Sequence, residues 1–203
     1  MQPSVRVILI GGTSNAGKST LAAHLAGRLG WTHVSTDSLA RHPGRPWKRY
    51  PEEVPPHVAE YYLDLTVEEM MVSVLDHYRR IWPLSETLIR RHAEDAGAGG
   101  LVLEGSALWP QLVATLRVPG VAAVWLTARP ELVEARIHRE SLYAEANPRG
   151  RRMIDAFVAR SQSYGAEMAA DLARLGLPSV EVGPNTTVEA LADACLDHMR
   201  PVG

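Results

Sequence analysis

Short apolar segments alternate with longer amphipathic segments along this chain. The apolar segments are rich in β-branched and aliphatic residues, and they predict five strands, at residues 5–10, 32–35, 101–103, 121–126 and 179–182. Strands that are apolar throughout are typical of a parallel sheet with helices on both faces. The alternation therefore predicts stacked β–α–β units and an α/β fold around a five-stranded parallel sheet.

The amphipathic segments predict helices at residues 18–29, 58–80 with a break, 84–94, 110–116, 131–146, 151–175 and 188–199. Residues 66–69 and 186–189 both match the capping box that starts a helix. Residues 147–152 have no helical or strand periodicity, and their proline and glycine predict a turn. No internal repeat or linker divides the chain, so we expect one domain over residues 1–203.

The composition is that of an ordinary globular protein, with 46% hydrophobic and 22% charged residues. A formal net charge of −2 provides no cationic field for a phosphate backbone, which excludes general nucleic-acid binding. The single cysteine, Cys195, continues an apolar helical stripe with Leu191 and Met199 and indicates a core position. No apolar run approaches the roughly 18 residues that cross a bilayer, and no signal-peptide pattern is present. We expect a cytoplasmic protein without membrane contact, and a homodimer is left open.

A glycine-rich segment follows the first predicted strand and precedes the first predicted helix. Residues 12–19 match the phosphate-binding motif G-x-x-x-x-G-K-[ST] at every position. Glycines let successive backbone amides turn toward an anion, the lysine reaches the outer phosphates of a nucleotide, and the final hydroxyl can ligate Mg²⁺. The candidate nucleotide-binding residues are Gly12, Thr13, Ser14, Asn15, Ala16, Gly17, Lys18, Ser19 and Thr20.

Three residues come just after the predicted strands at which a ligand would sit. Asp37, Glu104 and Thr127 follow or end the second, third and fourth strands. Ligands of open parallel sheets bind beyond the carboxyl ends of the strands, so we expect these side chains near the phosphate-binding loop. One alternative remains open for each carboxylate. Asp37 could instead cap a helix that begins at Ser38, and Glu104 could instead make a structural hydrogen bond.

The segments 11–20, 35–37 and 103–105 resemble the P-loop small-molecule kinases in their order and spacing. The likeness is to the nicotinamide riboside kinase and uridine kinase group, and the general layout also resembles chloramphenicol phosphotransferase, gluconate kinase and the zeta-toxin kinases. It covers most of the chain except residues 41–94. The resemblance implies a three-layer P-loop NTPase fold that uses ATP and Mg²⁺.

Roles for individual residues follow from this resemblance. It implies that Asp37 orients or deprotonates the acceptor hydroxyl and that Glu104 holds Mg²⁺ together with Ser19. It also implies that the loop carrying Asn185, before the last helix, packs on the adenine base, although this loop is equally well explained as a capped turn.

A group of arginines follows the fourth predicted strand and resembles the arginine-bearing lid of nucleoside monophosphate kinases and shikimate kinases. A planar guanidinium suits phosphate contacts and neutralises charge on a transferring phosphoryl group. We expect a lid at about residues 136–152, with Arg136 binding nucleotide and Arg151 and Arg152 acting in catalysis. The alternative is a solvated arginine face. The group comprises Arg129, Arg136, Arg139, Arg149, Arg151 and Arg152.

Residues 41–96 are the expected acceptor-binding insertion, because residues 41–62 mix aromatic, basic and polar side chains. An inert, proline-stiffened loop would have the same composition. The side chains in question are Arg41, His42, Arg45, Trp47, Lys48, Arg49, Tyr50, His57, Tyr61 and Tyr62.

Together these features predict an ATP-dependent kinase that phosphorylates a hydroxyl of a small-molecule metabolite such as a nucleoside, a sugar or an antibiotic. A nucleoside monophosphate kinase is the first alternative, since Arg41 and Arg45 could hold a phosphate acceptor. A nucleotide-dependent switch or assembly ATPase is the second, although the chain has no N-K-x-D motif. No zinc-type histidine spacing and no G-x-S-x-G motif is present.

Overall fold

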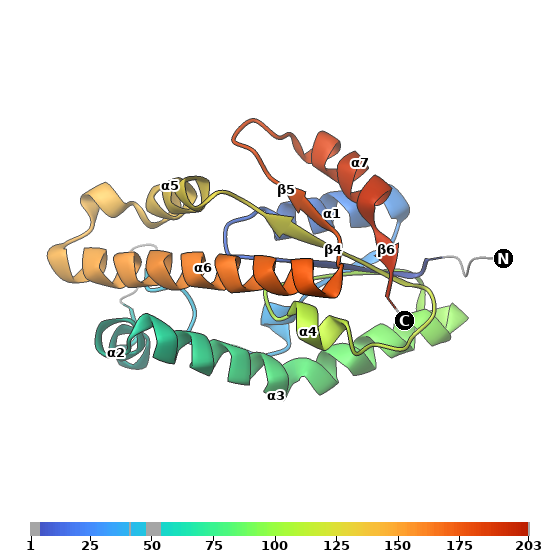
Figure 1. Cartoon of the computed structure of the whole chain (residues 1–203), viewed down its shortest axis with the longest axis horizontal. Helices are drawn as coiled ribbons and strands as arrows, with labels where there is room; N and C mark the ends of the chain where they lie inside the picture. The colour runs from blue at the N-terminus through green and yellow to red at the C-terminus, as the bar shows by residue number, and fades with distance from the viewer. Residues whose placement is uncertain (1–4, 41, 48–53, 203) are drawn as a thin grey trace.

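The predicted strands form one sheet in the computed structural model, which describes residues 5–40, 42–47 and 54–202. Five of them run parallel in the order β2-β3-β1-β4-β5, which confirms the predicted α/β class (Figure 1). These strands are β1 (Val7–Gly12), β2 (Thr32–Ser35), β3 (Leu101–Glu104), β4 (Val121–Thr127) and β5 (Ser179–Glu181). A further strand, β6 (Arg200–Pro201), pairs antiparallel with β4 and was not predicted, since two residues give no periodic pattern.

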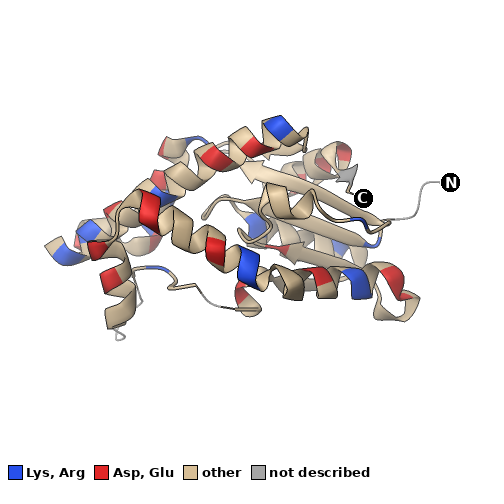
Figure 2. Cartoon of the chain, turned by 60° about the horizontal axis from the view of Figure 1, so that its bottom comes forward, with Lys and Arg blue, Asp and Glu red and all other residues tan. Residues whose placement is uncertain are grey.

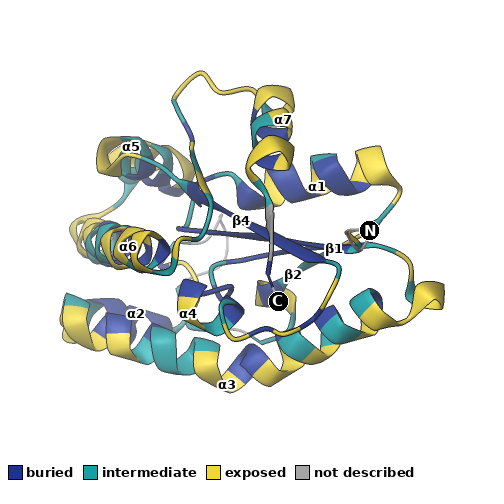
Figure 3. Ribbon diagram, turned by 45° about the vertical axis from the view of Figure 1, so that its right-hand side comes forward, coloured by how far each residue is buried: buried dark blue, intermediate teal, exposed yellow. Residues whose placement is uncertain are grey.

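The sheet is covered on both faces, as its continuous apolar strands predict. Successive strand side chains point to opposite faces, and they divide accordingly: Leu9 and Leu103 pack into one cluster, Ile8 and Val102 into another. The first cluster lies under α3 (Val67–Glu94), α4 (Pro110–Val113) and α6 (Pro148–Leu175), and the second under α1 (Lys18–Leu29) and α7 (Val188–His198). The central strands β1, β3 and β4 are buried between these two layers, whereas the edge strands β2 and β5 are partly exposed (Figure 3).

A third apolar cluster extends the molecule beyond the carboxyl ends of the strands. It joins α2 (Pro56–Asp64) and α5 (Pro130–Ser141) to the first half of α6. Figure 1 shows these helices projecting together past the sheet. These helices therefore form a wall beyond the carboxyl ends of the strands, which the sheet alone would leave open.

Three short 3₁₀ helices complete the described secondary structure: η1 (Thr36–Ser38), η2 (Ala96–Ala98) and η3 (Tyr143–Glu145). None of the described helices is long and apolar enough to span a membrane. Basic and acidic side chains are interspersed along the helices in the view of Figure 2, in keeping with the small net charge.

The long helix α3 differs from the prediction. We predict a helix boundary between residues 80 and 84, but α3 continues through Pro83. Proline in a helix costs about 3 kcal/mol, and burial of the preceding Ile81 and Trp82 offsets this cost. The break predicted within residues 58–80 is present, and it separates α2 from α3. Thr66 and Glu69 form the predicted capping box at the start of α3.

Residues 147–152 are not the predicted turn. They begin α6, with Pro148 as the first helical residue and the Asn147 carboxamide oxygen accepting from the Gly150 amide at 2.8 Å. Asparagine as the cap and proline in the first position are both strong helix starts. The preceding helix ends at Ser141 rather than 146, because Leu142 is in the left-handed conformation with φ 52°. The prediction of a capping box at residues 186–189 is also wrong. Thr187 is the N-cap of α7, and the Thr186 hydroxyl accepts from the backbone amide of Gly183 instead.

Candidate functional site

The main cavity lies at the carboxyl ends of the strands, where the sheet topology predicts it. Its volume is about 1400 Å³. The residues after β1, β2 and β3 form one side, and α2, α3, α5 and α6 form the other. Asp37 and Glu104 both line it, and Thr127 does not.

The phosphate-binding loop forms the floor of this cavity. Gly12 has φ 139°, and a Cβ there would lie 2.6 Å from the carbonyl oxygen of Leu126. Gly17 has φ 100° and begins α1 without a side-chain cap. The first amides of α1 therefore have no protein side chain to bind, which is the arrangement that receives a phosphate at a helix N-terminus. Ser14, Ala16 and Thr20 line the cavity as predicted.

Lys18 is held inside the loop itself. Its Nζ donates to the carbonyl oxygen of Thr13 at 2.7 Å. Burial lowers the pKa of Lys18, while the carboxylates of Glu104 and Asp37 act in the opposite direction. The ammonium thus has acidic neighbours on the cavity side, where a nucleotide's outer phosphates would lie.

Ser19 and Glu104 form a second polar contact beside the lysine. The Ser19 hydroxyl donates to Glu104 Oε1 at 3.1 Å, and Glu104 is 3% exposed. Among the described residues no group of three or more acidic, histidine or cysteine side chains could hold a metal. One hydroxyl and one carboxylate nonetheless fit Mg²⁺, which takes few protein ligands and completes its shell with water and phosphate oxygens.

Asp37 lies in η1, immediately after β2. Its backbone amide donates to the Ser35 hydroxyl at 3.3 Å, so Ser35 rather than Asp37 caps this turn. The capping alternative for Asp37 is therefore wrong. Its exposed carboxylate lines the cavity within electrostatic range of Lys18 and Arg45.

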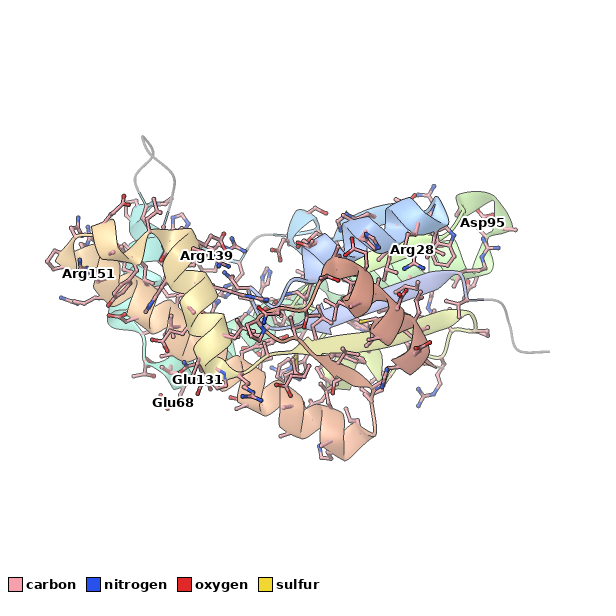
Figure 4. All side chains as sticks on the ribbon, turned by 90° about the horizontal axis from the view of Figure 1, so that it is seen from above. Arg28, Glu68, Asp95, Glu131, Arg139 and Arg151 are labelled. Carbon is pink, nitrogen blue, oxygen red and sulfur yellow. The ribbon has the colours of Figure 1, made fainter. Side chains whose placement is uncertain are left out.

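The arginines of the predicted lid divide into two groups. Arg136 and Arg139 line the cavity, and Arg136 Nη1 donates to the Asn15 carbonyl oxygen at 3.0 Å. Arg151 and Arg152 are outside the cavity, and Figure 4 shows Arg151 at the outer end of α6. Arg151 donates to the carbonyl oxygens of Ala146 at 3.0 Å and Ala144 at 2.8 Å. The catalytic role of Arg151 and Arg152 stays a prediction that requires this end of α6 to approach the loop.

The comparisons with known proteins bear on the fold. No family model matches the chain, and no curated protein matches it in sequence. A gluconokinase from Sinorhizobium meliloti 1021 superimposes with a TM-score of 0.53 at 20% identity, covering 96% of this chain and 90% of its own. A sugar kinase from Janibacter sp. HTCC2649 gives a TM-score of 0.50 at 17% identity, covering 96% and 94%. The fold is that of the P-loop kinases. The predicted three-layer P-loop architecture is confirmed.

In this P-loop kinase fold, one carboxylate of α5 links the segment after β2 to the phosphate-binding loop. Glu140 of α5 accepts from Asn15 Nδ2 at 2.7 Å and also pairs with Arg45. The Arg45 guanidinium lies 5.8 Å from the ring centre of Trp47. Glu140 therefore joins the nucleotide side of the cavity to the predicted acceptor segment, a link between distant positions that no local pattern indicates.

Several predicted residues lie elsewhere or outside the described residues. Asn185 is exposed in the loop after β5 and does not line the cavity, whereas Thr186 beside it does. His57 and Trp47 line the cavity as the acceptor segment predicts. Arg41, Lys48, Arg49 and Tyr50 are outside the described residues.

Arg160, the most deeply buried guanidinium of the cavity wall, is not among the residues predicted from the sequence. Arg160 is 9% exposed and lies on α6 between Phe157 and Tyr164, one helical turn from each. An arginine within an apolar helical stripe is a signal that could have been found, because arginine is almost never buried without a partner.

Burial of the imidazole of His42 predicts an acid-sensitive step in stability. Desolvation, reinforced by the charges of Arg160 and His77, lowers the pKa of His42 from 6.5 to about 3. The edge of Tyr61 packs against the same ring, with centroids 5.0 Å apart. Between pH 6.5 and 3 the unfolded chain binds a proton that the folded protein does not, so stability falls as the pH is lowered through this window.

We expect His42→Gln to weaken this dependence of stability on pH. The slope of the unfolding free energy against pH should decrease by the equivalent of less than one bound proton. Urea unfolding at several pH values between 7 and 4 measures it. His33→Gln, which removes an exposed imidazole on β2, is the matched control. Identical slopes for His42→Gln and the unchanged protein would contradict the assignment.

Proposed function

We propose that this protein is a kinase that transfers the γ-phosphoryl group of ATP to a hydroxyl of a small molecule. The observation that carries the proposal is the convergence of Lys18, the Ser19–Glu104 pair and Asp37 on one cavity. Phosphoryl transfer needs electrostatic stabilisation and alignment more than covalent chemistry from the protein. These side chains supply a fixed cation, a metal-binding pair and a carboxylate that orients a nucleophile.

The roles follow from position. The amides at the start of α1 and the Lys18 ammonium bind the outer phosphates, and Arg136 supports the loop through the Asn15 carbonyl oxygen. Ser19 and Glu104 would hold Mg²⁺, which when bound neutralises charge on the phosphates. The Asp37 carboxylate accepts a hydrogen bond from the acceptor hydroxyl and aims it in line with the γ-phosphate.

The size of the cavity favours a two-substrate reaction. A pocket for one small ligand typically measures about 300–1,000 Å³, and this cavity measures about 1400 Å³. The space beyond the phosphate-binding loop is bounded by aromatic and histidine side chains from three helices. A nucleotide switch that only hydrolyses ATP has no need of such a second compartment.

The proposal predicts ATP turnover that depends on an acceptor. With ATP and Mg²⁺, we expect ADP formation to rise at least about tenfold over the acceptor-free rate for one class within a panel of polyols, nucleosides, hydroxy acids and hydroxylated phosphate esters, because an aligned hydroxyl replaces water as the nucleophile. A coupled ADP assay measures the rate, and mass spectrometry identifies the phosphorylated product. ATP hydrolysis that no acceptor accelerates would favour the switch alternative instead.

A further inference from the structure

A buried positive charge with no counterion among the described residues lies in the part of the cavity beyond the phosphate-binding loop. We infer that the acceptor carries a carboxylate group and that Arg160 binds it. The inference rests on the proposed function, since it names the substrate class of the same site, and it is argued from the surroundings of Arg160.

Arg160 lies against two aromatic rings. Its guanidinium carbon lies 4.8 Å from the ring centre of Phe157 and 5.6 Å from that of Tyr62. Phe157 is one turn earlier on α6, and Tyr62 comes from α2. Contact with the two rings restricts the position of the guanidinium, whose paired N–H groups suit a planar anion.

The polar neighbours of Arg160 are neutral. Burial acts to lower the pKa of Arg160, but the surrounding tyrosines Tyr62, Tyr78 and Tyr61 outweigh it, and the pKa is raised. The Tyr61 hydroxyl donates to the Met70 carbonyl oxygen at 2.9 Å, and the Tyr62 hydroxyl donates to that of Gly44 at 2.6 Å. These tyrosines therefore turn oxygen lone pairs, not negative charges, toward the guanidinium.

No acidic side chain pairs with Arg160 in the part of the chain that the structure describes. Burying an unpaired cation is costly, so proteins almost always give it a partner. Arg160 lines the cavity, so an anion bound from the cavity can be the partner that the described residues do not supply.

The charge of this compartment selects the kind of anion. His42 is neutral at pH 7, because its pKa is lowered to about 3 by burial first and then by Arg160 and His77. Among the described residues of the segment after β2, Arg45 already pairs with Glu140. The Arg160 guanidinium carries one positive charge, which matches the single charge of a carboxylate, whereas a phosphate dianion is better matched by two cations.

The position of Arg160 also fits the reaction. Tyr78, Arg160 and Asp37 all line the cavity, and Tyr78 of α3 lies within electrostatic range of the other two. A molecule that places its carboxylate on Arg160 can present a hydroxyl to Asp37. The acceptor class is therefore a hydroxy acid.

Binding of a simple carboxylate tests the inference without any turnover. We expect millimolar benzoate to raise the melting temperature of the unchanged protein, while benzamide, its neutral analogue of the same shape, does not. Arg160→Met should abolish the benzoate effect, and Arg160→Lys should keep part of it, because lysine retains the charge but not the paired donors. Arg174→Met, at the exposed end of the same helix, is the control that keeps the full effect.

Each of the following results would overturn the inference. Equal stabilisation by benzamide, or a benzoate effect that survives Arg160→Met, would place the binding elsewhere. Stabilisation by inorganic phosphate that Arg160→Met abolishes, with no effect of benzoate, would assign a phosphate-bearing acceptor instead. A lower melting temperature for Arg160→Met with no carboxylate effect in the unchanged protein would make Arg160 a structural residue.

A kinetic comparison separates this inference from the proposed function. Among paired hydroxy acids and their primary amides, we expect only the acids to be phosphorylated, with Arg160→Met raising the acceptor KM about 10²-fold and leaving the KM for ATP unchanged. Equal use of acids and amides would overturn the carboxylate assignment and leave the kinase intact. Acceptor-independent hydrolysis together with a normal benzoate response would contradict the kinase and leave the anion site intact.

Discussion

Lys18→Ala is expected to lower acceptor-dependent turnover by about 10²-fold or more, which is the usual effect of removing one fixed electrostatic donor from an active site. The ammonium can interact more strongly with the charge that develops during transfer than with bound ATP, so turnover should fall more than ATP affinity. Steady-state kinetics with the acceptor found in the panel measures the effect, and equilibrium binding of an ATP analogue measures affinity.

The fold should survive this change. The Lys18 side chain makes one hydrogen bond, to the Thr13 carbonyl oxygen, and cavity water can replace that donor. Arg28→Ala is the matched control, since Arg28 is an exposed cation on the same helix, paired with Asp193. Near-normal turnover in a folded Lys18→Ala protein would contradict the role of the phosphate-binding loop.

Asp37→Asn is expected to reduce phosphoryl transfer by roughly 10²- to 10⁴-fold, the range for a positioned general base. Asparagine has the same size but lacks the charge that orients and polarises the acceptor hydroxyl. The cap of η1 is retained, because the Ser35 hydroxyl accepts from the backbone amide of residue 37 and not from its side chain. Loss of activity therefore reports on the carboxylate itself.

The affinity for ATP should change little in Asp37→Asn, which separates it from Lys18→Ala. Asp64→Asn, an exposed carboxylate at the end of α2, is the matched control. Rates equal to those of the unchanged protein, measured with the true acceptor, would remove Asp37 from the mechanism and leave Glu104 as the remaining cavity carboxylate that the sequence predicts.

The sheet, the phosphate-binding loop and two of the cavity carboxylates could be predicted because the sequence patterns that indicate them are local. The apolar strands predict a parallel sheet with two covered faces, since burial on both faces leaves no polar alternation to read. The loop at residues 12–19 predicts its own conformation, because a strand, a run with glycines and a helix start lie next to one another in the chain. Asp37 and Glu104 were placed by the rule that parallel strands end at one edge.

Local signals also misled where two of them competed. Pro83 predicts a helix boundary, but burial of its neighbours keeps α3 continuous. Proline and glycine at residues 147–152 predict a turn, yet Asn147 and Pro148 together start a helix. A residue pattern gives the preference of each position, and packing against distant elements decides which preference prevails.

The arrangement of side chains around Arg160 depended on tertiary structure. Arg160 comes from α6, Tyr62 from α2 and Tyr78 from α3, and only the packing of these helices brings the three side chains together. The contacts of Glu140 with Asn15 and Arg45 likewise join residues 125 and 95 positions apart. Short sequence patterns carry information over one or two helical turns, so the sequence by itself determined the sheet and the nucleotide loop. The long-range packing of side chains determined where the buried guanidinium of Arg160 lies and left it without an acidic partner among the described residues.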